Sequence, residues 1–242
     1  MRSLLPEPAG TVDLVHAYAY PGDGAWVRAN MVASIDGSAV ADGKSEPLSG
    51  PADKRVFGVL RGLADVVLVG AGTARAEGYR GLKARPSYAE HRAGLGQRPA
   101  PVLALVSASL DLDPATELFT GSERTIVLTT TMTDESARAR LAEVAEVIVT
   151  GTDRVDLSAA IDALVALGLP RVLCEGGPHL LADLVAAGRL DELCLTTTPR
   201  LVGGDGPRIV ADLHLGDVLE LGLAHLIEED GNLFARYLVS RA

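Results

Sequence analysis

The stretch Asp65-Val66-Val67-Leu68-Val69-Gly70-Ala71-Gly72-Thr73 places an uninterrupted apolar run between an aspartate and a glycine-containing turn. Runs of this kind are typical of strands that are buried on both faces of a parallel sheet. The same pattern returns along the chain at Val102–Val106, Thr125–Leu128, Val144–Val149 and Arg171–Cys174. The sequence therefore predicts a sheet that is built largely from parallel strands.

Helical segments alternate with these strands. Helices are predicted near Pro51, over Asp134–Ala142, over Ser158–Leu167 and from Pro178, and this alternation favours an α/β fold with right-handed crossovers. Three strands without intervening helices are expected at the end of the chain, with Asp230-Gly231 as a hairpin turn between the last two. Residues 80–99, rich in arginine, glycine and proline, are expected to form an exposed loop.

Composition limits the classes of protein that the chain can represent. Its 242 residues are 48% hydrophobic and 22% charged, with a formal net charge of −10, as in ordinary folded proteins. The acidic balance argues against nucleic acid and anionic membranes as partners. No apolar run approaches the roughly 18 residues of a membrane span, and two cysteines provide no disulfide framework, so a cytoplasmic location is expected.

Two glycine-containing turns follow predicted strands and lead into predicted helices. They are Gly70-Ala71-Gly72-Thr73 and Glu175-Gly176-Gly177-Pro178. The free N–H groups of a helix N-terminus attract phosphate, and glycine lets the phosphate approach the backbone, so both turns are candidate nucleotide-binding loops. Glycines that merely permit tight turns explain each loop equally well when it is taken alone.

Other signatures of chemistry are missing from the sequence. The standard dinucleotide and Walker patterns, the metal-binding His and Cys patterns and the serine-hydrolase elbow do not occur. No metal site is expected for this reason. Chemistry would then have to come from a bound cofactor.

Four motifs occur in an order that resembles a known family. They are Asn30-Met31-Val32-Ala33-Ser34-Ile35-Asp36-Gly37, Leu60-Arg61 before Ala64–Thr73, Cys174–Pro178 and Leu201-Val202-Gly203-Gly204. The chain resembles, over about residues 24–240, the pyrimidine reductases of bacterial riboflavin biosynthesis, the RibD C-terminal domain family of the dihydrofolate-reductase-like superfamily. The resemblance implies a mixed, mostly parallel sheet of about nine strands flanked by helices, in one reductase domain over 24–242 after an N-terminal extension over 1–23.

The same resemblance implies an activity and partners. NADPH would be the hydride donor, and the substrate a small phosphorylated pyrimidine, 5-amino-6-(5-phosphoribosylamino)uracil, whose ribosyl group is reduced to ribityl. A homodimer is the implied assembly.

The resemblance and the glycine turns together mark the site residues. The substrate contacts are Ser45, Arg61 and Glu175. The cofactor contacts are Ala33, Gly70, Gly72, Thr73, Glu77, Ser107, Gly176, Gly177, Pro178, His179, Leu180 and Leu181. Asp36 is a candidate catalytic proton donor, although its place in an Asp-Gly turn is a sufficient structural explanation.

One segment departs from the family pattern. The family commonly has Ala-Asp-Asp-Pro after the threonine and an arginine nearby, whereas this chain has Ala76-Glu77-Gly78-Tyr79-Arg80, with Arg85 as a substitute cation. The segment is expected to face the substrate. The altered segment therefore leaves open a dihydrofolate- or pteridine-type reductase on the same fold. A non-catalytic NADPH-binding protein is a further alternative that the sequence does not disprove.

Overall fold

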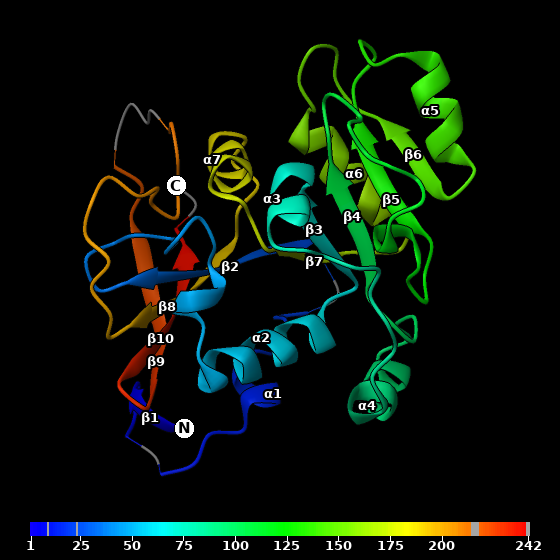
Figure 1. Ribbon diagram of the computed structural model, residues 1–242. Helices are drawn as coiled ribbons and strands as arrows, with labels where there is room; N and C mark the ends of the chain where they lie inside the picture. Colours follow the sequence, from blue (N-terminus) through cyan, green and yellow to red (C-terminus); the bar gives the residue numbers. More distant parts are fainter. Residues whose placement is uncertain (9, 23, 214–217, 241–242) are drawn as a thin grey trace. The chain divides into compact units, whose positions relative to one another are not determined.

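The computed structural model describes residues 1–8, 10–22, 24–213 and 218–240 (Figure 1). Residues 9, 23, 214–217 and 241–242, which fall within the expected segments 1–23 and 24–242, lie outside the described residues. The chain divides into two compact units. Unit 1 consists of residues 1–22, 26–60 and 174–242, and unit 2 is built mainly from residues 61–173. Each unit is described separately.

Unit 1 holds five strands in the order β1-β9-β10-β8-β2. Their bounds are β1 Arg2–Leu5, β2 Trp26–Ser34, β8 Glu192–Thr198, β9 Leu221–Glu229 and β10 Asn232–Val239. The pair β2 and β8 is parallel, whereas β1, β9, β10 and β8 pair antiparallel, as expected for the end of the chain. Asp230 and Gly231 both have positive φ, which suits the tight turn of the β9–β10 hairpin.

Helices of unit 1 are α1 Leu14–Ala17, the main part of α2 Pro51–Leu63, and α7 Pro178–Ala186. The Asp13 side chain accepts hydrogen bonds from the N–H groups of Val15 and His16 and so caps α1. Tyr18, just after α1, is 1% exposed. Residues 13–18 thus belong to the packed part of unit 1.

Unit 2 holds the strands β7-β3-β4-β5-β6 in that order. Their bounds are β3 Val66–Gly70, β4 Val102–Val106, β5 Thr125–Thr129, β6 Ala145–Val149 and β7 Arg171–Cys174, whose last residue is counted with unit 1. The pairings of β3 with β4, β4 with β5 and β5 with β6 are parallel. Val66–Val69 are fully buried, which explains why this strand reads as an uninterrupted apolar run.

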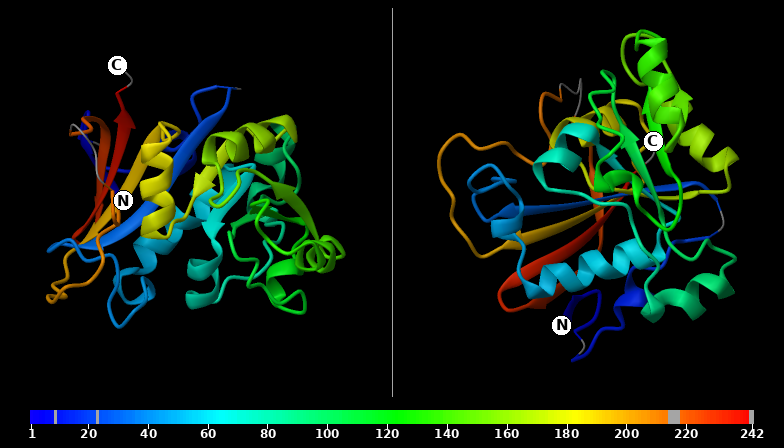
Figure 2. Two further views of the ribbon diagram at one scale, coloured as in Figure 1. Left: turned by 90° about the horizontal axis from the view of Figure 1, so that it is seen from above. Right: turned by 45° about the vertical axis from the view of Figure 1, so that its right-hand side comes forward.

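Helices of unit 2 are α3 Ala71–Ala76, α4 Ala89–Gly94, α5 Glu135–Ala142 and α6 Leu157–Ala166 (Figure 2). Asp134 and Asp156 cap α5 and α6 by accepting hydrogen bonds from first-turn N–H groups. Apart from shifts of one to a few residues at their ends, the predicted strands and helices are confirmed.

Two expectations about local structure are corrected. Residues 80–99 are not simply an exposed loop, because they contain a short 3-10 turn at Pro86–Tyr88, helix α4 and the buried side chain of Arg92. The described strands number ten, not nine, because Arg2–Leu5 pairs with β9. A four-residue strand whose partner lies more than 200 residues away leaves no periodic signal in the sequence.

A buried ionic cluster centres on Glu192 at the start of β8. Its carboxylate accepts hydrogen bonds from Arg28 Nε at 2.6 Å, Arg236 Nε at 2.9 Å and Trp26 Nε1 at 2.9 Å. Arg28 and Arg236 also donate to the backbone carbonyls of Tyr18 and Ala17, respectively. The cluster therefore ties strands β2, β8 and β10 to the segment that carries α1.

His225 on β9 lies beside this cluster, opposite Arg236 in the strand register and edge-on to the Tyr18 ring, with ring centroids 4.8 Å apart. Burial, reinforced by the positive charge of Arg236, lowers the pKa of His225 to about 4. Since an unfolded chain binds the imidazole proton near pH 6.5, the unfolded state is the more protonated one between pH 4 and 6.5. Folding stability contributed by neutral His225 is therefore complete above pH 6.5 and is lost as the pH falls toward 4.

We expect His225→Phe, which keeps an aromatic ring beside Tyr18 but cannot titrate, to remove about 2 kcal/mol of the pH dependence of stability. Urea unfolding at pH 7 and pH 4.5 measures this difference. The matched control is His16→Gln, because His16 is an exposed residue of α1. This variant should keep the parent's difference in stability between pH 7 and pH 4.5. If His225→Phe keeps the parent's difference in stability between the two pH values, His225 is not the source of that pH dependence.

Candidate functional site

In unit 2, the predicted cofactor residues gather at the carboxyl ends of β3 and β4. Gly70 ends β3 and is the N-cap of α3, with no side-chain hydrogen bond to the first-turn N–H groups. Gly70 pairs with Val106, the residue before Ser107. Ligands of α/β sheets bind beyond these strand ends, so the location agrees with the predicted role.

The turn after Gly70 is open where a ligand needs space. A side chain at Gly72 would meet no atom within 4 Å, and the Thr73 side chain is half-buried. Glu77, also half-buried, follows the last turn of α3, where its N–H donates to the Thr73 carbonyl at 2.9 Å. Ser107 is 5% exposed, and its Oγ accepts a hydrogen bond from the Leu110 N–H at 3.0 Å. Ser107 therefore shapes its own turn.

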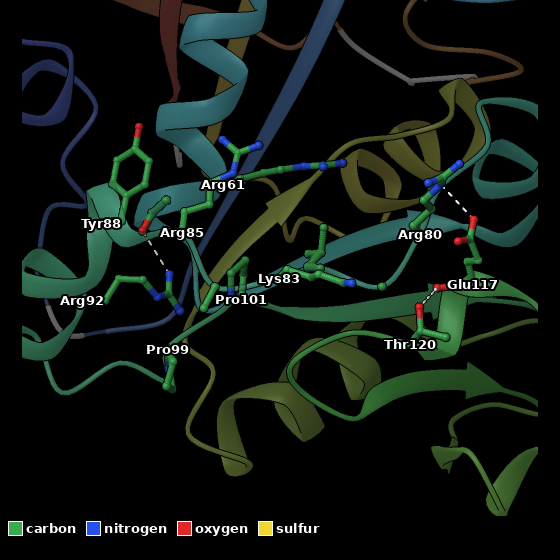
Figure 3. A pocket seen from close by; sticks show the side chains of 14 residues that line it. Arg61, Arg80, Lys83, Arg85, Tyr88, Arg92, Pro99, Pro101, Glu117 and Thr120 are labelled. Atoms are coloured by element: carbon green, nitrogen blue, oxygen red, sulfur yellow. Dashed lines mark hydrogen bonds and ion pairs between the residues drawn. The ribbon is translucent and has the colours of Figure 1, made fainter.

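A basic pocket of about 410 Å³ lies in unit 2. Figure 3 shows its lining side chains, with Arg85, Tyr88 and Arg92 on one side and Arg80 with Glu117 on the other. The cations that line it are Arg61, Arg80, Lys83, Arg85 and Arg92. Glu117 forms an ion pair with Arg80, with Nε to Oε2 at 3.0 Å. A concentration of positive charge in a chain of net charge −10 indicates a site for an anionic ligand.

Arg61 reaches the pocket from the last turn of α2. Its half-buried guanidinium lies over the ring of Tyr79, 5.2 Å from the centroid. A cation–π contact of this kind fixes the direction of a long side chain. Tyr79, which departs from the family pattern, thus positions the arginine that the resemblance assigns to the substrate.

In unit 1, the second glycine turn leads into α7. Gly177 is the N-cap of α7 without a side-chain hydrogen bond, Pro178 occupies the first turn, and that turn holds no acidic residue. Gly176 has a φ of +85°, and a Cβ there would lie 3.4 Å from Met31 Sδ on β2. The uncapped first turn of a helix preceded by glycines fits the pyrophosphate of a dinucleotide.

Other members of this segment differ in exposure. Leu180 and Leu181 are buried, so their side chains pack in the core and only their backbone could contact a ligand. His179 is exposed, and its Nε2 lies 3.1 Å from Asp212 Oδ2. Glu175 is 8% exposed and precedes the turn.

Asp36 acts as an anchor for the Leu201–Gly204 motif. Its carboxylate accepts hydrogen bonds from Ser34 Oγ at 2.5 Å, Gly203 N at 2.7 Å and Val202 N at 3.2 Å. These bonds, with Ser34 the strongest, lower the pKa of Asp36 to about 2. A carboxylate that is ionised at neutral pH cannot donate a proton, so the geometry favours the structural explanation of Asp36.

Ala33 and Ser45 complete the predicted set in unit 1. Ala33 is a buried residue of β2 opposite Thr197 of β8, and Ser45 is half-buried before a 3-10 turn at Glu46–Leu48. The predicted residues thus form two groups, one in each unit. Ala33, Asp36, Ser45 and residues 175–181 belong to unit 1, and Arg61, Gly70, Gly72, Thr73, Glu77 and Ser107 belong to unit 2.

Sequence reasoning placed Arg80 in the segment expected to face the substrate, but it missed the lining cations Lys83 and Arg92 and the packing role of Tyr88. The density of arginine in residues 80–99 was the available signal, but solvated loops have the same composition. Among the described residues, no cluster of three or more potential metal ligands occurs, and no helix is long and apolar enough to cross a membrane.

Comparison with known proteins gives the family. A family model described as the RibD C-terminal domain matches residues 25–232, and the chain belongs to this family. The expected resemblance to pyrimidine reductases of riboflavin biosynthesis is therefore confirmed.

Individual relatives agree with this assignment. The chain is 30% identical over 180 residues to the 2,5-diamino-6-ribosylamino-4(3H)-pyrimidinone 5′-phosphate reductase of Methanothermobacter thermautotrophicus, covering 74% of this chain and 80% of the relative. The enzyme of the same name from Archaeoglobus fulgidus is 29% identical, with 74% and 82% covered. A pyrimidine reductase-like protein of Corynebacterium diphtheriae is 31% identical with a TM-score of 0.79, covering 90% and 93%, and confirms the expected fold class.

Proposed function

We propose that the protein is an NADPH-dependent reductase that converts the ribosyl group of a 5-amino-6-ribosylaminopyrimidine 5′-phosphate to ribityl. The uracil form is the substrate expected from the sequence, and the archaeal relatives are named for the 2-amino form. The observation that carries the proposal is the basic pocket of unit 2, which contains the family's substrate arginine, Arg61, in an otherwise acidic protein.

The residues of the pocket suit a phosphate monoester. Arg61 and Arg85 present guanidinium groups, which bind phosphate through paired, charge-assisted hydrogen bonds. Glu175, which belongs to unit 1 and is not a lining residue of this pocket, is a buried carboxylate that can accept hydrogen bonds from sugar hydroxyls or ring N–H groups. Binding of the phosphate by the two guanidinium groups would restrict the orientation of the attached sugar, and such orientation supplies rate through proximity.

The two glycine turns fit NADPH, which supplies a hydride when it is bound. In unit 1, the uncapped N–H groups of α7 at Gly177 would hold phosphate, and Ala33 offers only a small side chain. In unit 2, taken by itself, the N–H groups of α3 after Gly70 are likewise without a side-chain cap. The backbone N–H groups act as fixed dipoles, so they hold phosphate without adding a titratable group to the site.

The test follows the absorbance of NADPH with purified protein and three substrates at matched concentration. We expect rapid oxidation with the uracil or the 2-amino pyrimidine phosphate and none with dihydrofolate. Preference for dihydrofolate would contradict the substrate class. NADPH binding without oxidation in all three reactions would contradict catalysis and favour a binding protein.

A homodimer and a cytoplasmic location belong to the same proposal. Leu223 on β9 and Leu233 on β10 lie on the same face of the hairpin and expose 44% and 37% of their surface, which supports a contact between copies of the chain. Light scattering on the purified protein would give the mass, and a monomer at micromolar concentration would contradict the dimer. Fractionation of the source cells would test the location.

A further inference from the structure

Arg92 differs from the other cations of the basic pocket in its burial. The side chain is 2% exposed, although it lines the 410 Å³ pocket together with the exposed Lys83 and Arg85. Burial lowers the pKa of the Arg92 guanidinium from its usual value, and the nearby Asp65 acts in the opposite direction. A buried charge is costly unless other groups compensate it.

Two of the three guanidinium nitrogens of Arg92 donate hydrogen bonds to backbone carbonyls. Arg92 Nε donates to the Arg98 carbonyl at 2.7 Å, and Nη1 donates to the carbonyls of Gly62 and Ala64 at 3.0 and 2.7 Å. Nη2 has no hydrogen-bond partner within the part of the chain that the structure describes. Nη2 is itself buried, so its N–H groups have neither a protein acceptor nor contact with bulk solvent, and an acceptor from a ligand would compensate them.

Open space adjoins Arg92 on more than one side. A second pocket of about 470 Å³ in unit 2 shares Ala84, Arg85, Arg92 and Pro99 with the first pocket. Arg92 is thus a wall residue of both cavities.

The hydrogen bonds that Arg92 donates to backbone carbonyls also connect it to the turn that carries Arg61. Gly62, which follows Arg61, receives one of these bonds and is packed against Tyr88, since a Cβ at Gly62 would lie 2.6 Å from the Tyr88 ring. Tyr88 and Arg92 therefore hold the last turn of α2 from two directions. In Figure 3, Arg61, Arg85, Tyr88 and Arg92 lie around the same part of the pocket.

We propose that Arg92 is a specificity-determining, ligand-binding residue whose Nη2 donates to the anionic group held by Arg61 and Arg85. The identification of that group as the 5′-phosphate of the substrate rests on the proposed function. A neutral sugar hydroxyl in its place would leave the buried charge uncompensated. Arg92 thus favours the phosphorylated over the dephosphorylated substrate.

Inorganic phosphate is the probe for the first measurement, because its binding does not depend on catalysis. Calorimetric titration compares the parent protein, Arg92→Met and Arg92→Lys. The matched control is Arg98→Met, a neighbouring arginine outside both pockets. We expect Arg92→Met to weaken phosphate binding about tenfold or more, as for the loss of a charge-assisted hydrogen bond, and Arg98→Met to leave it unchanged.

Arg92→Lys keeps the charge and one donor for the carbonyls of Gly62 and Ala64 but has no second nitrogen. If Arg92→Met does not fold, Arg92→Lys alone should still weaken phosphate binding and raise KM for the phosphorylated substrate, with kcat and NADPH affinity nearly unchanged. A variant that merely loosened the fold would alter NADPH affinity as well.

Phosphate affinity equal to the parent in Arg92→Lys would overturn the proposal, as would the absence of phosphate binding by the parent protein. Phosphate binding that depends on Arg92 in a protein that oxidises no NADPH would support the anion site and contradict the proposed function. Failure of the Arg92 proposal and failure of the proposed reductase function therefore give different results.

Discussion

Arg61→Met is expected to lower kcat/KM for the pyrimidine phosphate about 100-fold, mainly through KM, while NADPH affinity stays within about twofold of the parent. The variant removes a charge-assisted contact to phosphate but retains an apolar side chain beside the Tyr79 ring. Arg61 reaches the pocket from the last turn of α2, a place fixed by Tyr88 and Arg92. The loss should therefore be one of binding and not of folding.

Steady-state kinetics with the pyrimidine phosphate and NADPH measures kcat/KM. Fluorescence titration with NADPH measures the affinity for the cofactor. Arg140→Met is the matched control, because Arg140 is an exposed arginine of α5 in the same unit and lies outside both pockets. Unchanged kinetics in Arg61→Met would remove this arginine from the substrate site. Loss of NADPH affinity as well would show that the residue serves the cofactor.

Glu192→Gln is expected to lower the free energy of unfolding by about 3–5 kcal/mol, because it leaves the buried guanidinium of Arg28 and the partly buried one of Arg236 without their shared anion. Burial alone would raise the pKa of Glu192, but Arg28 and Arg236 hold it below its usual value. Stability from this carboxylate is therefore present above the unfolded pKa near 4.5 and is lost as the pH falls through the lower folded pKa.

Urea unfolding at pH 7 measures the loss in Glu192→Gln. The control Glu46→Gln breaks an exposed ion pair with Lys54, whose side chains are 71% and 58% exposed, and should leave the midpoint unchanged. Equal midpoints for the two variants would show that the buried cluster contributes no more than a surface pair.

Local patterns in the sequence predicted the strands and helices because their causes are local. The apolar run at Val66–Val69 reflects burial on both faces, and the Asp230-Gly231 pair supports a backbone with positive φ. Asp134 and Asp156 cap helices through bonds to residues two or three positions away. Such interactions join residues that are close in the sequence, so a short stretch of sequence is enough to predict them.

Only those residues of the candidate site that belong to a recognisable sequence motif were predicted. The glycines after β3 and β7 and the family motifs indicated nucleotide-binding turns, and Arg61 was named through the resemblance. Arg92 was missed because its partners, Gly62 and Ala64, contribute backbone carbonyls, which no sequence pattern identifies. A buried arginine and a solvated one look alike in a sequence.

The sequence by itself thus determined the class of fold, the order of its elements and the positions of the glycine turns, since each follows from neighbours along the chain. The tertiary structure alone decided which charges are buried. Glu192 meets Arg28 and Arg236 from 164 and 44 residues away, and Arg92 meets Gly62 from 30 residues away. Long-range packing removes water from these groups, and burial changes what a charged side chain can do.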